Sequence, residues 1–151
     1  AGDVPAANVV LDLRVGDKAA LLRELGRIAE RCGSAVPAAA VTEALARREA
    51  MGSTGLGGGF ALPHASLPGL ESFVVAVVRL ARPIPYDAVD EAPVDVVCML
   101  LTPAAGADHV ATLAAYARLF RGAQPLGLVR SARTVEELVA RLSPAGGTAG
   151  P

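Results

Sequence analysis

Aromatic residues are scarce in this chain, which has no Trp and an aromatic share of only 3%. A single-strand nucleic-acid binder needs aromatic side chains on which bases stack, and this sequence offers no such platform. A basic excess is missing as well, because the formal net charge is −1. Both absences argue against a nucleic-acid partner.

Long apolar runs are also absent, so no segment is expected to span a bilayer, and no basic-then-apolar leader stands at the start. The two cysteines, Cys32 and Cys98, lie far apart in apolar contexts and form no C-x-x-C pair. We expect both to be reduced core residues of a cytoplasmic protein. The two histidines have no metal-binding spacing and no cysteine cluster near them, so we expect no metal site.

What is abundant is aliphatic residues, since 52% of the 151 residues are hydrophobic and only 19% are charged. This composition suffices for one well-packed domain built on Leu, Val and Ala. We expect an N-terminal extension at residues 1–8, a domain over 9–142, and a flexible Gly/Pro-rich tail at 143–151.

Strands and helices are interleaved along the predicted domain, but not in a simple alternating βαβ order. Apolar, partly β-branched runs predict strands at residues 9–13, 72–80 and 94–102, with a shorter extended piece at 83–86. Helical periodicity predicts a helix after Asp17, one over 34–48, one capped by Asp108, and a last one begun by the Thr134–Glu137 capping box. The pattern predicts an α/β protein, a three-layer α/β/α sandwich whose mixed, mostly buried sheet is flanked by helices.

A glycine-rich stretch at residues 52–59 (GSTGLGGG) predicts a tight loop without regular structure. The stretch lacks the lysine of a P-loop, and Phe60 stands where a G-x-G-x-x-G fingerprint needs its last glycine. No G-x-S-x-G nucleophile motif occurs in the sequence. These three phosphate-binding or hydrolase motifs are therefore excluded.

The histidines remain as candidates for chemistry. His64 follows the apolar segment 61–63, which anchors the backbone and holds the side chain at the surface. A neutral imidazole has one nitrogen lone pair that attacks a phosphoryl group when the other nitrogen is oriented by an acceptor. His109 is expected in the first turn of a helix, where an anion is stabilised. Taken alone, each histidine is equally well explained as an inactive loop residue.

Residues 48–65 (REAMGSTGLGGGFALPHA) extend this interpretation. The stretch resembles the active-site signature of the mannitol/fructose-type enzyme IIA domains of the phosphoenolpyruvate-dependent phosphotransferase system. The nitrogen-regulatory enzyme IIA proteins share that signature. Residues 83–101 resemble the segment before the central strand of that family, and His109 falls where the family has a second active-site histidine. The family's fold, a mixed sheet between helical layers, agrees with the pattern above.

The resemblance implies roles for individual residues. His64 would accept phosphate from an HPr-like carrier, and His109 would lie beside it and stabilise the transferring group. Arg48 would pair with phosphate oxygens; alternatively it is a solvated charge at a helix end. Ser53 and Thr54 would donate hydrogen bonds to phosphate, or would only satisfy the loop. The family needs no metal and no organic cofactor.

Two departures from the family pattern leave partner preference open: Ser66, where many members have a long polar residue, and the Pro/Gly-rich segment 122–133. The first hypothesis is a nitrogen-regulatory enzyme IIA, favoured by the single short domain, whose phosphorylation alters binding to a regulatory target. The second is a sugar-uptake subunit that passes phosphate to an enzyme IIB. The third is a non-catalytic anion-binding or interaction module, against which the presence of both histidines argues.

Overall fold

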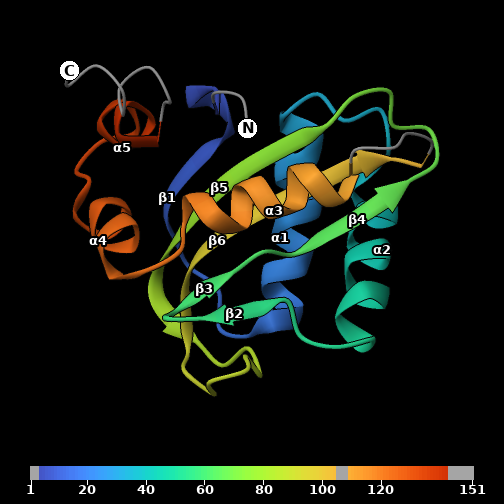
Figure 1. Ribbon diagram of the computed structural model, residues 1–151. Helices are drawn as coiled ribbons and strands as arrows, with labels where there is room; N and C mark the ends of the chain where they lie inside the picture. Colours follow the sequence, from blue (N-terminus) through green and yellow to red (C-terminus); the bar gives the residue numbers. More distant parts are fainter. Residues whose placement is uncertain (1–3, 105–108, 143–151) are drawn as a thin grey trace.

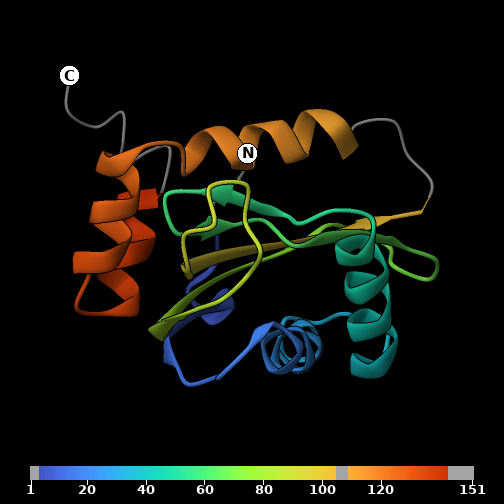
Figure 2. The ribbon, with the colours of Figure 1, turned by 90° about the horizontal axis from the view of Figure 1, so that it is seen from below.

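The computed structural model describes residues 4–104 and 109–142 of the chain. These residues form three layers, in which a mixed β-sheet separates helices α1 and α2 from helix α3 (Figures 1 and 2). Helices α4 and α5 stand together at one end of the sheet (Figure 2). The predicted α/β/α sandwich with a mixed sheet is thus confirmed.

The strands are β1 Val9–Leu13, β2 Gly55–Gly57, β3 Phe60–Ala61, β4 His64–Leu67, β5 Val74–Ile84 and β6 Val94–Pro103. The helices are α1 Lys18–Arg31, α2 Ala38–Ala50, α3 His109–Leu119, α4 Ala123–Ser131 and α5 Val135–Leu142, preceded by the short 3-10 helix η1 Ala6–Asn8. Val4, in the segment expected to be an extension, is buried in the second core described below.

The sheet has the strand order β1-β5-β6-β3-β2, and β4 also pairs with β6. β1 runs parallel to β5, β5 antiparallel to β6, and β3 antiparallel to β2. β3 and β4 both run parallel to β6, so they are successive segments along one side of the same strand. Between them lie only Leu62 and Pro63, where the chain leaves and rejoins the sheet.

Both faces of β6 are buried, which explains why its sequence has no polar alternation. Alternate β6 side chains enter two different cores: Val97, Met99 and Leu101 join the core with α1 and α2, while Val96, Cys98 and Leu100 join the core with α3, α4 and α5. Of the two candidate histidines, His64 pairs with Leu100 of this strand, and His109 begins helix α3.

Two predicted helix starts are confirmed by their side-chain bonds. The Asp17 carboxylate accepts from the backbone N–H of Ala20 at 2.8 Å, and the Thr134 hydroxyl accepts from that of Glu137 at 3.0 Å. The predicted Asp108 cap, part of the loop before it and the predicted tail lie outside the described residues.

Other boundaries differ from the prediction. The helix expected over 34–48 begins at Ala38, because Pro37 occupies its N-cap position and Ser34 forms a turn with Val36. The piece expected at 83–86 is the end of β5, which runs on to Ile84. Helix α4 forms within the Pro/Gly-rich segment, since its proline lies in the first turn, where no backbone N–H is needed.

The absence of regular structure predicted for the glycine-rich stretch is wrong in part. Gly55–Gly57 forms β2 and pairs antiparallel with β3. Gly57, the last residue of β2, and Gly58 and Gly59, which turn the chain into β3, all have positive φ. The stretch is therefore a short hairpin whose turn requires glycine.

Candidate functional site

His64 is the first residue of β4 and is half-buried. Its Nδ1 lies 2.7 Å from the carbonyl oxygen of Leu62, in the short gap between β3 and β4. A carbonyl oxygen only accepts hydrogen bonds, so Nδ1 carries the proton and Nε2 has the lone pair. Nε2 accepts a hydrogen bond of 3.2 Å from Nε of Arg48.

The surroundings of His64 favour its neutral form. Burial lowers the pKa of the imidazole below its usual value, and the positive charge of Arg48 lowers this pKa further. The hydrogen bond to the Leu62 carbonyl and the charge of Glu49 act in the opposite direction without reversing the shift. The side chain is therefore an uncharged imidazole with one oriented lone pair at neutral pH, which is the form that acts as a nucleophile.

Arg48, near the end of α2, lies beside His64 as the sequence interpretation requires. Besides the bond to His64, its guanidinium donates through Nη1 to the carbonyl of Gly52 at 2.7 Å. Two directed contacts thus fix a permanent positive charge next to the lone pair of Nε2. A guanidinium held in this way matches the oxygens of a phosphoryl group.

The structure brings the second histidine to the same place. His64 and His109 line one pocket of about 80 Å³, to which Ser66 and Thr102 also contribute. Nδ1 of His109 lies 3.4 Å from the Ser66 hydroxyl, which in turn contacts the Thr102 hydroxyl at 2.9 Å. Nε2 of His109 is buried and has no hydrogen-bond partner among the described residues.

The hydroxyls of Ser53 and Thr54 are engaged within the protein. Ser53 donates to the carbonyl of Tyr86 at 3.1 Å and accepts from the backbone N–H of Gly55. Thr54 is only 2% exposed and contacts the Glu49 carboxylate and the Tyr86 hydroxyl. This geometry matches the loop-satisfying alternative for both residues.

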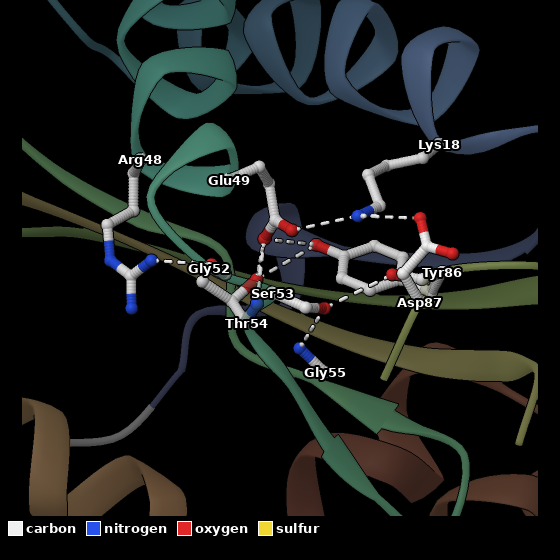
Figure 3. Close-up of polar contacts among 9 residues, drawn as sticks. All are labelled: Lys18, Arg48, Glu49, Gly52, Ser53, Thr54, Gly55, Tyr86 and Asp87. Atoms are coloured by element: carbon white, nitrogen blue, oxygen red, sulfur yellow. Dashed lines mark hydrogen bonds and ion pairs between the residues drawn. The ribbon is translucent and has the colours of Figure 1, made fainter. Parts of the chain in front are cut away.

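Sequence reasoning assigned no role to Glu49, which is the centre of a polar cluster with Lys18, Thr54 and Tyr86 (Figure 3). Glu49 is one of the residues that match the signature at 48–65, and this match is the signal that pointed toward it. Its partners Lys18 and Tyr86 are 31 and 37 residues away in sequence, and nothing in their local context indicates that they meet.

A larger pocket of about 770 Å³ lies near the opposite end of α3, between the β2–β3 hairpin and α4. Neither histidine lines this pocket, and the chemistry described above does not involve it. Over residues 4–104 and 109–142, no three His, Cys, Asp or Glu side chains are grouped as ligands for a metal ion. None of the helices in these ranges has the length and hydropathy needed to cross a bilayer.

An α/β/α sandwich with a neutral, oriented histidine beside an arginine is the arrangement of a histidine phosphocarrier domain. The model of the family "Phosphoenolpyruvate-dependent sugar phosphotransferase system, EIIA 2" matches residues 4–144. The chain belongs to this family, and so is a phosphotransferase-system component of the class that carries phosphate on histidine.

Relatives and solved structures agree with this assignment. The chain is 39% identical over 144 residues to a nitrogen regulatory protein of Bradyrhizobium diazoefficiens, covering 93% of each chain. It is 38% identical to one from Pseudomonas aeruginosa, covering 82% of this chain and 80% of that protein. The crystal structure of nitrogen regulatory protein IIA-Ntr from Neisseria meningitidis superposes with a TM-score of 0.88 at 35% identity, covering 93% of this chain and 96% of that one. IIA mannitol from Escherichia coli shares the fold, with a TM-score of 0.79 at 17% identity, over 93% of this chain and 99% of that one.

Proposed function

We propose that this chain is a nitrogen-regulatory type enzyme IIA that accepts a phosphoryl group on Nε2 of His64 from an HPr-like carrier in the cytoplasm. The observation that carries the proposal is the hydrogen bond from Nδ1 of His64 to the Leu62 carbonyl, which leaves the lone pair on Nε2. This nitrogen attacks the phosphorus of the carrier's phosphohistidine. The new N–P bond forms as the old one breaks, and the bonding electron pair returns to the carrier's imidazole.

Arg48 and His109 stabilise the transferring group in this proposal. As phosphate arrives, the Arg48 guanidinium exchanges its bond to Nε2 for bonds to phosphoryl oxygens, which are stronger because both partners are charged. His109 begins the eleven-residue helix α3 and lines the pocket shared with His64, and its Nε2 has no hydrogen-bond partner among the described residues. Transfer of a phosphoryl group depends mainly on positioning and on such charge stabilisation.

The dimensions of the site favour a protein as phosphate donor. The pocket of about 80 Å³ accommodates a phosphoryl group, whereas sites for whole small molecules measure roughly 300–1,000 Å³. Large apolar side chains surround the opening: Val110, which lines the pocket, is 79% exposed, and Phe73, whose ring contacts His109, is 39% exposed. Exposed apolar side chains at a reactive site are typical of a docking surface for another protein.

The named relatives support the nitrogen-regulatory branch over sugar uptake, because those from Bradyrhizobium diazoefficiens and Pseudomonas aeruginosa are nitrogen regulatory proteins matched over most of their length. In the nitrogen-regulatory branch, the phosphorylation state of this protein would control its binding to a regulatory target. The sugar-uptake alternative also has support. A fructose-specific EIIA component of Haloferax volcanii is 40% identical over 80 residues, and a mannitol enzyme IIA is known in complex with its phosphorylated enzyme IIB.

Ser53 and Thr54 are not assigned to phosphate in this proposal. Their hydroxyls already bond to Tyr86 and Glu49, and Thr54 is buried. A phosphate role for either residue would require the loop to break those contacts.

Phosphorylation by two alternative carriers tests the proposed function. The protein is incubated with phosphoenolpyruvate, enzyme I and either a nitrogen-branch or a sugar-branch HPr, and an acid-labile phosphate is followed by mass spectrometry. We expect label on the wild type, none on His64→Ala, and faster labelling by the nitrogen-branch carrier. An unlabelled wild type with both carriers, or full label on His64→Ala, would contradict the phosphocarrier role. Faster labelling by the sugar-branch HPr would favour the sugar-uptake alternative.

A further inference from the structure

We propose that Glu49 is a positioning residue that holds Arg48 against Nε2 of His64, an inference that rests on the proposed phosphoryl transfer to His64. The Glu49 side chain is only 6% exposed, although it carries a carboxylate next to the protein surface. Burying a carboxylate is costly unless it is fully paired, so its partners indicate what it holds together.

Four donors bond to this carboxylate. Oε1 accepts from the backbone N–H of Thr54 at 3.0 Å, from the Thr54 hydroxyl, and from the Tyr86 hydroxyl at 3.1 Å. Oε2 pairs with the Lys18 ammonium at 3.0 Å. One carboxylate thus ties the end of α2 to the start of α1, to the loop before β2, and to the chain after β5 (Figure 3).

Glu49 bonds to the same loop whose Gly52 carbonyl accepts a hydrogen bond from Arg48. The chain turns sharply after α2, where Gly52 has a φ of +148°. Two neighbouring side chains of α2 then hold this loop: Arg48 through the Gly52 carbonyl, and Glu49 through Thr54, two residues later. If the bonds to Thr54 are lost, the Gly52 carbonyl is no longer fixed, and the guanidinium loses one of the two contacts that aim its Nε at His64.

Lys18 makes this arrangement compatible with an incoming phosphate. A carboxylate close to the phosphorylated histidine would repel the phosphoryl oxygens. The Lys18 ammonium offsets that charge at Oε2, and it also lies 3.7 Å from Asp87 and 4.5 Å above the Tyr86 ring. Arg48 therefore keeps its full positive charge available for phosphate rather than pairing with the carboxylate beside it.

A role confined to fold stability is the competing explanation, and a double-mutant cycle separates the two. Glu49→Gln keeps the size of the side chain but removes the charge that draws Lys18 and the hydroxyls. We expect it to slow phosphorylation of His64 roughly ten- to a hundredfold, because a misplacement of about 1 Å can cost up to a hundredfold in rate. In an Arg48→Ala background, Glu49→Gln should cause no further slowing, since its effect passes through Arg48.

Arg79→Met provides the matched control for lost stability. Arg79 is a partly buried cation that bonds to Asp12 and to the Ala132 carbonyl near α4 and α5, and it takes no part in the site. We expect the Arg79→Met variant and the Glu49→Gln variant both to unfold at lower urea concentration than the wild type. The phosphorylation rate of Arg79→Met should nevertheless stay at the wild-type value. Slowing of Arg79→Met in proportion to its lost stability, or undiminished slowing by Glu49→Gln without Arg48, would overturn the proposal.

The ¹⁵N resonances of the unphosphorylated imidazole give a readout that does not need transfer. The Nε2 resonance of His64 should move in Glu49→Gln toward its position in Arg48→Ala, because both changes weaken the same hydrogen bond. A wild-type Nε2 resonance in Glu49→Gln would contradict the positioning role. Failure to label the wild type would contradict the proposed function alone, and these resonances would still decide whether Glu49 positions Arg48.

Discussion

The Nδ1–H group of His64 donates a hydrogen bond of 2.7 Å to the carbonyl oxygen of Leu62, within a two-residue gap between strands. The proline in this gap has no backbone N–H and cannot continue the sheet as an ordinary residue would. The chain therefore leaves β6 at Leu62, whose carbonyl becomes the acceptor that fixes the tautomer of the neighbouring histidine.

This tautomer predicts the position of the phosphate. We expect the phosphorylated protein to carry its phosphate on Nε2 of His64, with Nδ1 still protonated and bonded to Leu62. Two-dimensional ¹H–¹⁵N spectra of the imidazole, recorded with ³¹P decoupling, distinguish the two nitrogens. A phosphorus coupling at Nδ1 would contradict this orientation of the ring.

The lowered pKa of His64 predicts a pH dependence of stability. Burial lowers this pKa in the folded chain, whereas the unfolded chain titrates near the usual value of about 6.5. Below that pH the unfolded state binds a proton that the folded state resists, so stability falls as the pH drops from about 6.5 toward the folded pKa. Above about pH 6.5 neither state binds this proton, so the stability is not reduced by His64.

Urea unfolding of the wild type and of His64→Gln between about pH 5 and pH 8 checks the sign, since the interval brackets the usual histidine pKa. We expect the variant to lose less stability than the wild type on acidification. Equal losses in both proteins would show that His64 does not contribute in this way.

His109 is predicted to assist transfer without being required for it. His109→Ala removes a ring that lines the pocket and leaves the Leu62 and Arg48 contacts of His64 in place. We expect phosphorylation roughly a hundredfold slower, at the low end of the range for the loss of one stabilising donor, with His64 still fully modified at long times. Quenched-flow labelling measures this rate, and unchanged rates of both phosphorylation and dephosphorylation would refute the supporting role.

Helix packing around Gly26 gives a prediction about stability alone. A Cβ at Gly26 of α1 would lie 2.4 Å from the Thr42 hydroxyl and 2.5 Å from the Ala38 carbonyl of α2. Gly26→Ala should therefore destabilise the protein by about 1–3 kcal/mol, the usual range for overpacking. Gly127 in α4 is the matched control, because a Cβ there meets nothing within 4 Å. Gly127→Ala should stabilise by about 0.4–1 kcal/mol. Urea unfolding measures both, and equal effects would contradict the close packing of α1 on α2.

The sequence predicts those elements whose pattern is local. The strand over 94–102 can be predicted because both of its faces are buried and its sequence is therefore almost entirely apolar. The helix after Asp17 can be predicted because its apolar residues recur at helical spacing. β2 cannot be predicted from its sequence, because it is a strand only through its pairing with β3 across a turn and not through any pattern in its own three residues. Gly59 shows the reason for the glycines there, because its φ of +88° is a backbone conformation that other residues rarely adopt.

The candidate site also contains features that the sequence predicts and features that only the folded structure shows. The signature around His64 and the helix start at His109 are sequence features, and the parallel pairing of β4 with β6 brings them to one pocket. The cluster of Lys18, Glu49 and Tyr86 joins three distant parts of the chain, and each member by itself resembles an ordinary surface or core residue. Only the packing of α1 and α2 against the sheet brings their side chains together.

The pairing of β4 with β6 has one more consequence. His64 lies opposite Leu100, and the Pro63 carbonyl accepts from the N–H of Leu100 at 3.0 Å, so the backbone at the histidine is bonded to the most deeply buried strand. Such a backbone moves only when the whole fold opens, and its amide hydrogens should be among the slowest to exchange. We therefore expect the backbone of β4 to keep the same conformation in the unmodified and the phosphorylated protein. A partner that distinguishes the two forms would then recognise the added charge at His64 and the side chains that bind it, rather than a change of fold.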